Sequence, residues 1–130
     1  MRLLNGMTIK KIERLESFFD EDCIEEMLEE CTVHCCHFNA ANLCRTFSDW
    51  DCFGYVEGYV GESGHAICSY KDYDGNFHYF DPTQEWEIRE GTRKRFIDEI
   101  EVIKEYTYDE INEIFLRDGK THLISVNAVR

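Results

Sequence analysis

Proline and basic residues are scarce in this sequence of 130 residues. It has one proline, Pro82, and 14 lysines and arginines against 27 aspartates and glutamates, which gives a net charge of −13. Because no stretch is rich in proline, glycine or serine, we expect a single domain over residues 1–130. An acidic surface repels nucleic acid and anionic membranes, so neither is expected as a partner.

Long hydrophobic runs are also missing. Residues 1–10 lack the apolar core of a signal peptide, and no segment is long enough to span a membrane. The seven cysteines are odd in number and, without a secretion signal, are expected to be reduced thiols. These features predict a cytoplasmic protein, located in the host cytoplasm if the protein is viral.

The sequence does have an apolar content of 43%, which is enough for a core. The spacing of its apolar residues predicts helices in the N-terminal part of the chain. Residues 8–17 form the first expected helix, with Ile12 and Leu15 inward. The second carries Ile24, Met27, Leu28 and Cys31 at i, i+3, i+4 and i+7, with Ser17 or Asp20 as its cap. The third covers residues 35–47.

Strands are expected after the helices, at residues 53–60, 64–71, 76–81 and 100–105. Residues 85–96 are expected to form a loop with a short strand at 86–89. A capping box at Thr107–Glu110 opens a further helix closed by Gly119, and residues 122–129 form a last strand. Helices followed by a mainly antiparallel sheet predict the α+β class.

The third expected helix places a cysteine at its N-terminus. Its inward stripe begins at Cys36, whereas Cys35 lies toward the polar stripe with Asn39 and Asn42. Unpaired amides and the helix dipole lower the pKa of a thiol at this position, and the Cys36 N–H is available for an oxyanion hole. Cys36 is therefore the preferred nucleophile, and Cys35 is its rival.

Thiol catalysis also needs a histidine and a group that orients it, and two neighbouring strands offer His65 and Asp81. Pro82 keeps Asp81 extended. The two side chains share a face only if the intervening hairpin has a three-residue loop, with Gly75 in the left-handed region. The segment Asp72–Gly75 suits that turn, so we predict it.

The segments Cys36-His37-Phe38-Asn39-Ala40, Gly54–Val60, His65-Ala66 and Asp81-Pro82-Thr83 resemble small phage and bacterial proteins of the papain-like or transglutaminase-like class. The resemblance covers about residues 35–83. It implies a papain-like fold, with N-terminal helices packed on the sheet, and a Cys36–His65–Asp81 triad. Two departures are Ile67, where a tryptophan often follows His-Ala, and the missing oxyanion donor, for which Asn39 and Thr32 are candidates.

Each candidate residue also has a plainer interpretation. Cys36 fits a buried apolar position, His65 fits the start of a strand, and Asp81 fits a cap for the turn before Pro82. Asn39, Glu57 and Tyr59 are candidates for substrate binding, although Glu57 equally suits an exposed position and Tyr59 suits packing. The remaining cysteines are expected to be core or half-buried thiols: Cys23, Cys31, Cys44, Cys52 and Cys68.

A cluster of thiols and imidazoles, Cys31, His34, Cys35, Cys36 and His37, also suits a zinc site. A structural zinc site usually pairs two ligand clusters, and a second cluster would have to come from Cys44, Cys52, Cys68 or His78, at no recognised spacing. We therefore expect no cofactor and no metal.

The sequence thus predicts a cysteine hydrolase or acyltransferase that acts on an amide, peptide or isopeptide bond through a thioester, with a protein or peptide substrate. Hydrolysis, deamidation and transglutamination share this chemistry. Two alternatives stay open. One is a catalytically inert acidic binding protein, such as a phage-encoded inhibitor of a host protein, and the other is a metal-binding protein. The sequence leaves the oligomeric state undetermined.

Overall fold

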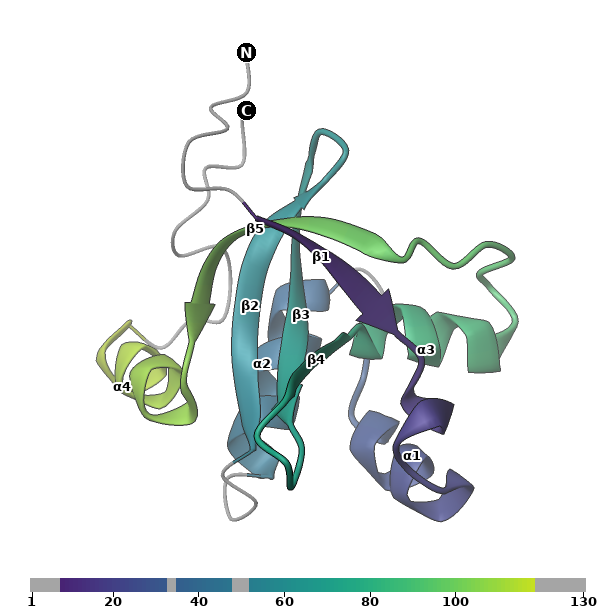
Figure 1. Cartoon of the computed structure of the whole chain (residues 1–130), viewed down its shortest axis with the longest axis horizontal. Helices are drawn as coiled ribbons and strands as arrows, with labels where there is room; N and C mark the ends of the chain where they lie inside the picture. Colours follow the sequence, from purple (N-terminus) through teal and green to yellow (C-terminus); the bar gives the residue numbers. More distant parts are fainter. Residues whose placement is uncertain (1–7, 33–34, 48–51, 119–130) are drawn as a thin grey trace.

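Five strands close into a barrel, and helices pack against its outside (Figure 1). The computed structural model describes residues 8–32, 35–47 and 52–118. The strand order around the barrel is β1-β4-β3-β2-β5, and β5 pairs again with β1. The strands are β1 Thr8–Glu13, β2 Phe53–Val60, β3 Ser63–Lys71, β4 Phe77–Phe80 and β5 Glu99–Tyr106. The helices are η1 Leu15–Ser17, α1 Glu21–Leu28, α2 Cys36–Thr46, α3 Pro82–Glu90 and α4 Tyr108–Asp118.

The closed barrel contradicts the predicted papain-like α+β arrangement of N-terminal helices packed on a sheet. The decisive segment is residues 8–17, which was expected to be helical and instead forms β1 and the short helix η1. Strand β1 pairs in parallel with β4, where Ile12 faces Tyr79, and antiparallel with β5, where Lys10 faces Ile100. Both partners lie far along the chain, so local spacing carried no sign of this closure.

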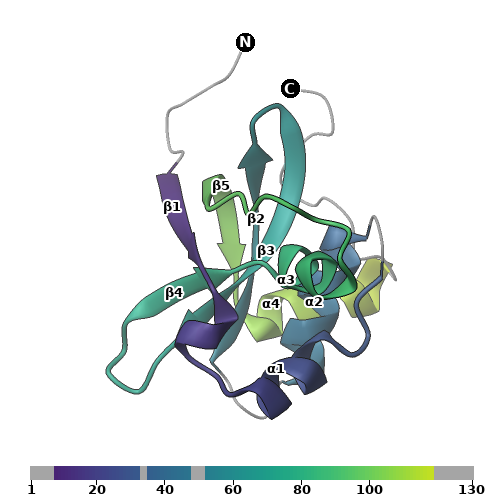
Figure 2. The same ribbon diagram turned by 90° about the vertical axis from the view of Figure 1, so that its right-hand side faces the viewer.

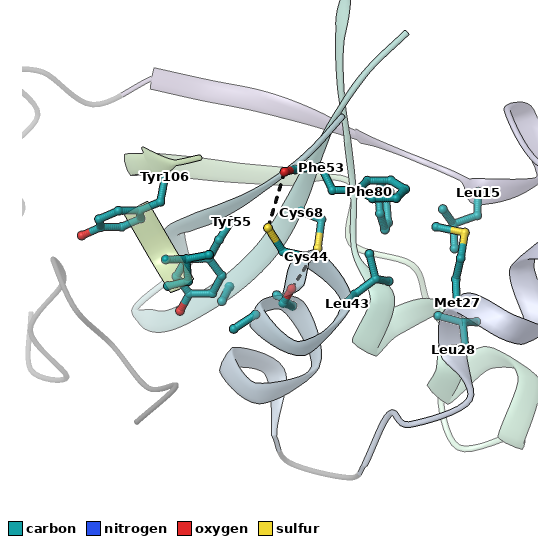
Figure 3. Close-up of a cluster of buried hydrophobic side chains, with 14 of the residues drawn as sticks. Leu15, Met27, Leu28, Leu43, Cys44, Phe53, Tyr55, Cys68, Phe80 and Tyr106 are labelled. Atoms are coloured by element: carbon teal, nitrogen blue, oxygen red, sulfur yellow. Dashed lines mark hydrogen bonds between the residues drawn. The ribbon is translucent and has the colours of Figure 1, made fainter. Parts of the chain in front are cut away.

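Two hydrophobic cores lie on the two faces of the barrel wall. The interior core draws on all five strands and consists of Ile12, Val56, Ile67, Tyr79, Ile100 and Val102. The outer core lies between the wall and the helices and includes Leu43, Phe53, Tyr55, Cys68 and Phe80 (Figure 3). Since both faces of β2 are covered, its first seven residues are all buried.

Helices α1 and α2 confirm two of the expected helices. Asp20, rather than Ser17, caps α1, because its side chain accepts a hydrogen bond of 2.9 Å from the Cys23 N–H. Helix α2 lies against β3, where the Cys68 thiol donates to the Ala40 carbonyl at 3.3 Å. Figure 2 shows α2 and α3 side by side on the outside of β3, which brings their N-terminal ends to the same region.

Helix α3 covers much of the segment 85–96, which was expected to be a loop with a short strand at 86–89, so that expectation was wrong. Asp81 caps the helix by accepting from the Gln84 N–H at 3.1 Å, and Pro82 takes the first helical position. Gly91 ends the helix in the left-handed region with φ 79°. An Asp-Pro start and a glycine end are a usual pair of helix boundaries, and here they outweigh the strand-forming residues between them.

The predicted capping box at the start of α4 is confirmed. The Thr107 N–H donates to the Glu110 carboxylate at 2.9 Å, and the Glu110 N–H donates to the Thr107 hydroxyl at 3.2 Å. Gly119 and the strand expected at residues 122–129 lie outside the described residues. Within the described part of the chain, no helix is both long and apolar enough to cross a membrane.

A substitution at Gly58 tests how closely the backbones of β2 and β5 approach each other. A Cβ at this position would overlap the carbonyl oxygen of Glu101 on β5, next to a shift in strand register. We expect Gly58→Ala to lower the free energy of unfolding by about 2 kcal/mol, because backbone atoms must move apart. Urea unfolding followed by circular dichroism measures this change, with the exposed Ser63→Ala as control. A Gly58→Ala protein as stable as the control would contradict the close approach of β2 and β5.

Candidate active site

The candidate nucleophile, Cys36, is the first residue of α2, and Cys35 is the N-cap. The first amides of an α-helix have no partner within the helix, so they point toward this end and favour negative charge there. Cys36 is half-buried, whereas Cys35 is exposed. The structure therefore places Cys36, and not its neighbour, against the barrel wall.

The predicted three-residue hairpin loop is confirmed. The Asp72 N–H donates to the Asn76 carbonyl at 2.9 Å, so residues 73–75 form the loop, and Gly75 has φ 86°. In this register Cys68 pairs with Phe80. If the register continues by one residue, Ile67 lies opposite Asp81. His65 and Asp81 then lie diagonally on one face, as the triad requires.

A hydrogen bond joins His65, the candidate base, to Asp81, its candidate orienting group. The distance from His65 Nε2 to Asp81 Oδ2 is 2.6 Å, and the two side chains are 17% and 0% exposed. Because Asp81 occupies Nε2, the other ring nitrogen of His65 is left for the Cys36 thiol, and the two groups lie near enough to shift each other's pKa. The structure thus brings the three predicted catalytic residues together from α2, β3 and the end of β4.

Asp81 is itself held in place by Gln84. Besides the N-cap bond, the Gln84 side-chain amide donates to Asp81 Oδ2 at 2.8 Å. The same amide group donates to the Ile97 carbonyl and accepts from the Ile97 N–H, each at 2.8 Å. Burial raises the pKa of Asp81, but the charge of His65 and the bonds from His65 and Gln84 lower it further, so the net shift is downward.

Opposite pKa shifts favour an ion pair between the thiol and the imidazole. Burial raises the pKa of Cys36, but hydrogen bonds to His37 and His65 outweigh it and lower the value to about 6. Burial lowers the pKa of His65, but Asp81 and the Cys36 thiolate raise it to about 10. Between these values the site holds a thiolate next to an imidazolium.

His37 also lies at the site, although from the sequence its only expected role is that of a zinc ligand. Its Nδ1 lies 3.6 Å from Cys36 Sγ. Its Nε2 is buried and has no hydrogen-bond partner. The sequence offered little sign of this contact, since residues i and i+1 of a helix point in different directions and His37 is off the apolar stripe.

Asn39, a candidate for substrate or oxyanion binding, is buried and fully engaged. Its amide nitrogen donates to the Thr32 carbonyl and to the Thr83 hydroxyl, and its oxygen accepts from the Thr32 N–H, all at 2.9 Å. Asn39 therefore ties the segment before α2 to the start of α3. This arrangement places Cys36 relative to Asp81 and leaves no amide hydrogen of Asn39 for a ligand.

Glu57 and Tyr59, the other candidates for substrate binding, are buried on β2, at 0% and 6% exposure. The alternative of an exposed Glu57 is therefore wrong. The Tyr55 hydroxyl donates to Glu57 at 2.9 Å. Burial, the charge of Glu57 and the nearby Cys36 all raise the pKa of Tyr55, so this phenol stays protonated behind the thiol.

The remaining cysteines are buried or half-buried, as predicted: Cys23, Cys31, Cys44, Cys52 and Cys68. Burial raises the pKa of Cys44 to about 12 and raises that of Cys68 well above its usual value. Within the described residues, no group of three or more histidines, cysteines or carboxylates is placed to hold a metal ion. His34, one of the zinc-ligand candidates, lies outside those residues.

Comparison with protein-family models, curated proteins and solved structures finds no match to this chain. The resemblance to papain-like and transglutaminase-like proteins therefore stays a prediction from the quoted segments, and the closed barrel excludes the papain-like arrangement that it implied.

The thiolate can be titrated directly. In a Cys35→Ala background, we expect the rate of Cys36 alkylation by iodoacetamide to rise with a midpoint near pH 6, because the imidazoles stabilise the thiolate. His65→Ala removes one of them and should move the midpoint toward 9.0, the ordinary value of the thiol. Mass spectrometry of the Cys36 peptide measures each rate. A midpoint near 9 in the unchanged site would contradict the ion pair.

Proposed function

We propose that this protein is a thiol hydrolase or acyltransferase that acts on an amide, peptide or isopeptide bond. Cys36 is the nucleophile, His65 is the general base and acid, and Asp81 orients His65. The observation that carries the proposal is the position of His65, which bonds Asp81 at 2.6 Å and lies near enough to the Cys36 thiol that each group shifts the other's pKa. This is the arrangement of nucleophile, base and orienting group that thiol catalysis needs.

The acylation step follows from the ion pair. The Cys36 thiolate attacks the carbonyl carbon, a C–S bond forms, and the carbonyl π electrons move onto the oxygen. The His65 imidazolium then gives its proton to the amine nitrogen, the C–N bond breaks and the carbonyl re-forms as a thioester. The Cys36 N–H, at the first position of α2, supplies one donor to the transient oxyanion.

The deacylation step returns the site to its starting state. Water attacks the thioester and gives a proton to the neutral His65, and the C–S bond breaks to restore thiolate and imidazolium. If an amine attacks in place of water, the product is a new amide, so the same site serves hydrolysis, deamidation or transglutamination. The substrate class is a protein or peptide that presents a carbonyl to α2.

The cellular setting belongs to the same proposal. All seven cysteines are present as thiols, and a reactive thiolate lasts in a reducing compartment. We place the protein in the cytoplasm, of the host if it is viral.

Labelling by a fluorescent vinyl sulfone near neutral pH tests the proposal. We expect label on Cys36 of the wild type, no label at this position in Cys36→Ala, and labelling slower by about a hundredfold in His65→Ala, because the thiolate loses its partner. Cys35→Ala is the matched control and should label like the wild type. Mass spectrometry locates the label.

Equal labelling of wild type, Cys36→Ala and His65→Ala would end the enzyme hypothesis at this site. Reaction of Cys36 no faster than that of a cysteine in an unfolded peptide would favour the alternative of an inert acidic binding protein. Metal bound in stoichiometric amount to the purified protein would favour the alternative of a metal-binding protein.

A further inference from the structure

The oxyanion hole of the proposed enzyme lacks a second donor. Three side-chain donors in this part of the fold are engaged elsewhere. The Asn39 amide donates to Thr32 and Thr83, and the Gln84 amide donates to Asp81 and Ile97. The Tyr55 hydroxyl donates to Glu57. A group at the start of α2, beside the Cys36 N–H, is better placed for this role than these three side chains.

His37 lies at the required place. Its Nδ1 is 3.6 Å from Cys36 Sγ. In the tetrahedral intermediate, the oxyanion is bonded to the same carbon as Sγ, so it is only two bonds away from the sulfur. A donor that reaches Sγ in the resting enzyme therefore reaches the oxyanion through a small change of ring angle.

The buried Nε2 of His37 indicates which nitrogen carries the proton. A buried N–H without a partner is rarer and more costly in proteins than a buried acceptor without one. Nε2 is buried and has no partner. A proton on Nε2 would create such an orphaned N–H, whereas a proton on Nδ1 leaves Nε2 as an acceptor and points the N–H at Cys36. The burial of Nε2 therefore favours the tautomer that donates toward the thiol.

We propose that His37 is a catalytic residue whose Nδ1–H bonds the Cys36 thiolate in the resting enzyme and the oxyanion in the tetrahedral intermediate, beside the Cys36 backbone N–H. This inference rests on the proposed thiol-acyl chemistry. It gives the two neighbouring residues separate roles, since Cys36 forms the bond to carbon and His37 stabilises the charge that this bond creates on oxygen.

Two reagents separate the role of His37 on the oxyanion from its role on the thiolate. p-Nitrophenyl acetate acylates a thiolate through a tetrahedral oxyanion, whereas iodoacetamide alkylates it without one. In a Cys35→Ala background, we expect His37→Ala to lower the ratio of acylation to alkylation rate at Cys36 by about a hundredfold. His37→Gln, which keeps an N–H donor, should recover part of the ratio. Asn42→Ala, on the same helix, should leave it unchanged.

The outcomes distinguish the inference from the function on which it rests. If the wild type forms no acetyl-enzyme at Cys36, both fail. If the wild type is acylated at Cys36 and His37→Ala leaves the ratio unchanged, the function stands and His37 has no role on the oxyanion. Should the variants not fold, ¹H–¹⁵N spectra of the wild-type imidazoles decide the matter. A proton on Nδ1 of His37 supports the inference, and a proton on Nε2 overturns it.

Discussion

The buried carboxylate of Asp81 connects the barrel, helix α3 and the thiol site. It follows the last residue of β4, caps α3, and accepts bonds from both His65 and Gln84. An unpaired carboxylate at 0% exposure would be strongly unfavourable, so the fold and the charge on His65 depend on each other. The residue proposed to orient the base is therefore also the residue that starts the neighbouring helix.

Burial alone would make every inner thiol of this protein unreactive. It raises the pKa of Cys31 and of Cys44 to about 12 in each case. Cys36 is also desolvated, yet its pKa falls to about 6, because its interactions with His37 and His65 stabilise the thiolate. The low pKa of this one thiol among seven thus comes from the histidines around it, and the helix N-terminus adds to that effect.

Local signals in the sequence were enough to predict β2, α2 and the hairpin, and the predicted hairpin loop set His65 and Asp81 on one face. The sequence does not predict helix α3, although Asp81, Pro82 and Gly91 mark its ends, because an Asp-Pro pair also suits a turn. Strand β1 was not predictable in this way, since its partners are distant in the chain. The contact of His37 with the thiol depends on the packing of α2 against the barrel, which the sequence pattern does not report.

The ion pair also determines how stability responds to pH. In the unfolded chain the pKa values of the Cys36 thiol and the His65 imidazole are 9.0 and 6.5. In the folded protein they are about 6 and about 10. From about pH 6.5 to 9 each state holds one proton on the pair, so the pair gives no pH dependence. Above pH 9 the folded state keeps its proton until about pH 10, so stability falls as pH rises through this interval.

The lowered pKa of Asp81 stabilises the fold above pH 3.8, and this stabilisation is lost as pH falls through the folded pKa of Asp81. The site thus supports the fold at the neutral pH where its thiolate exists.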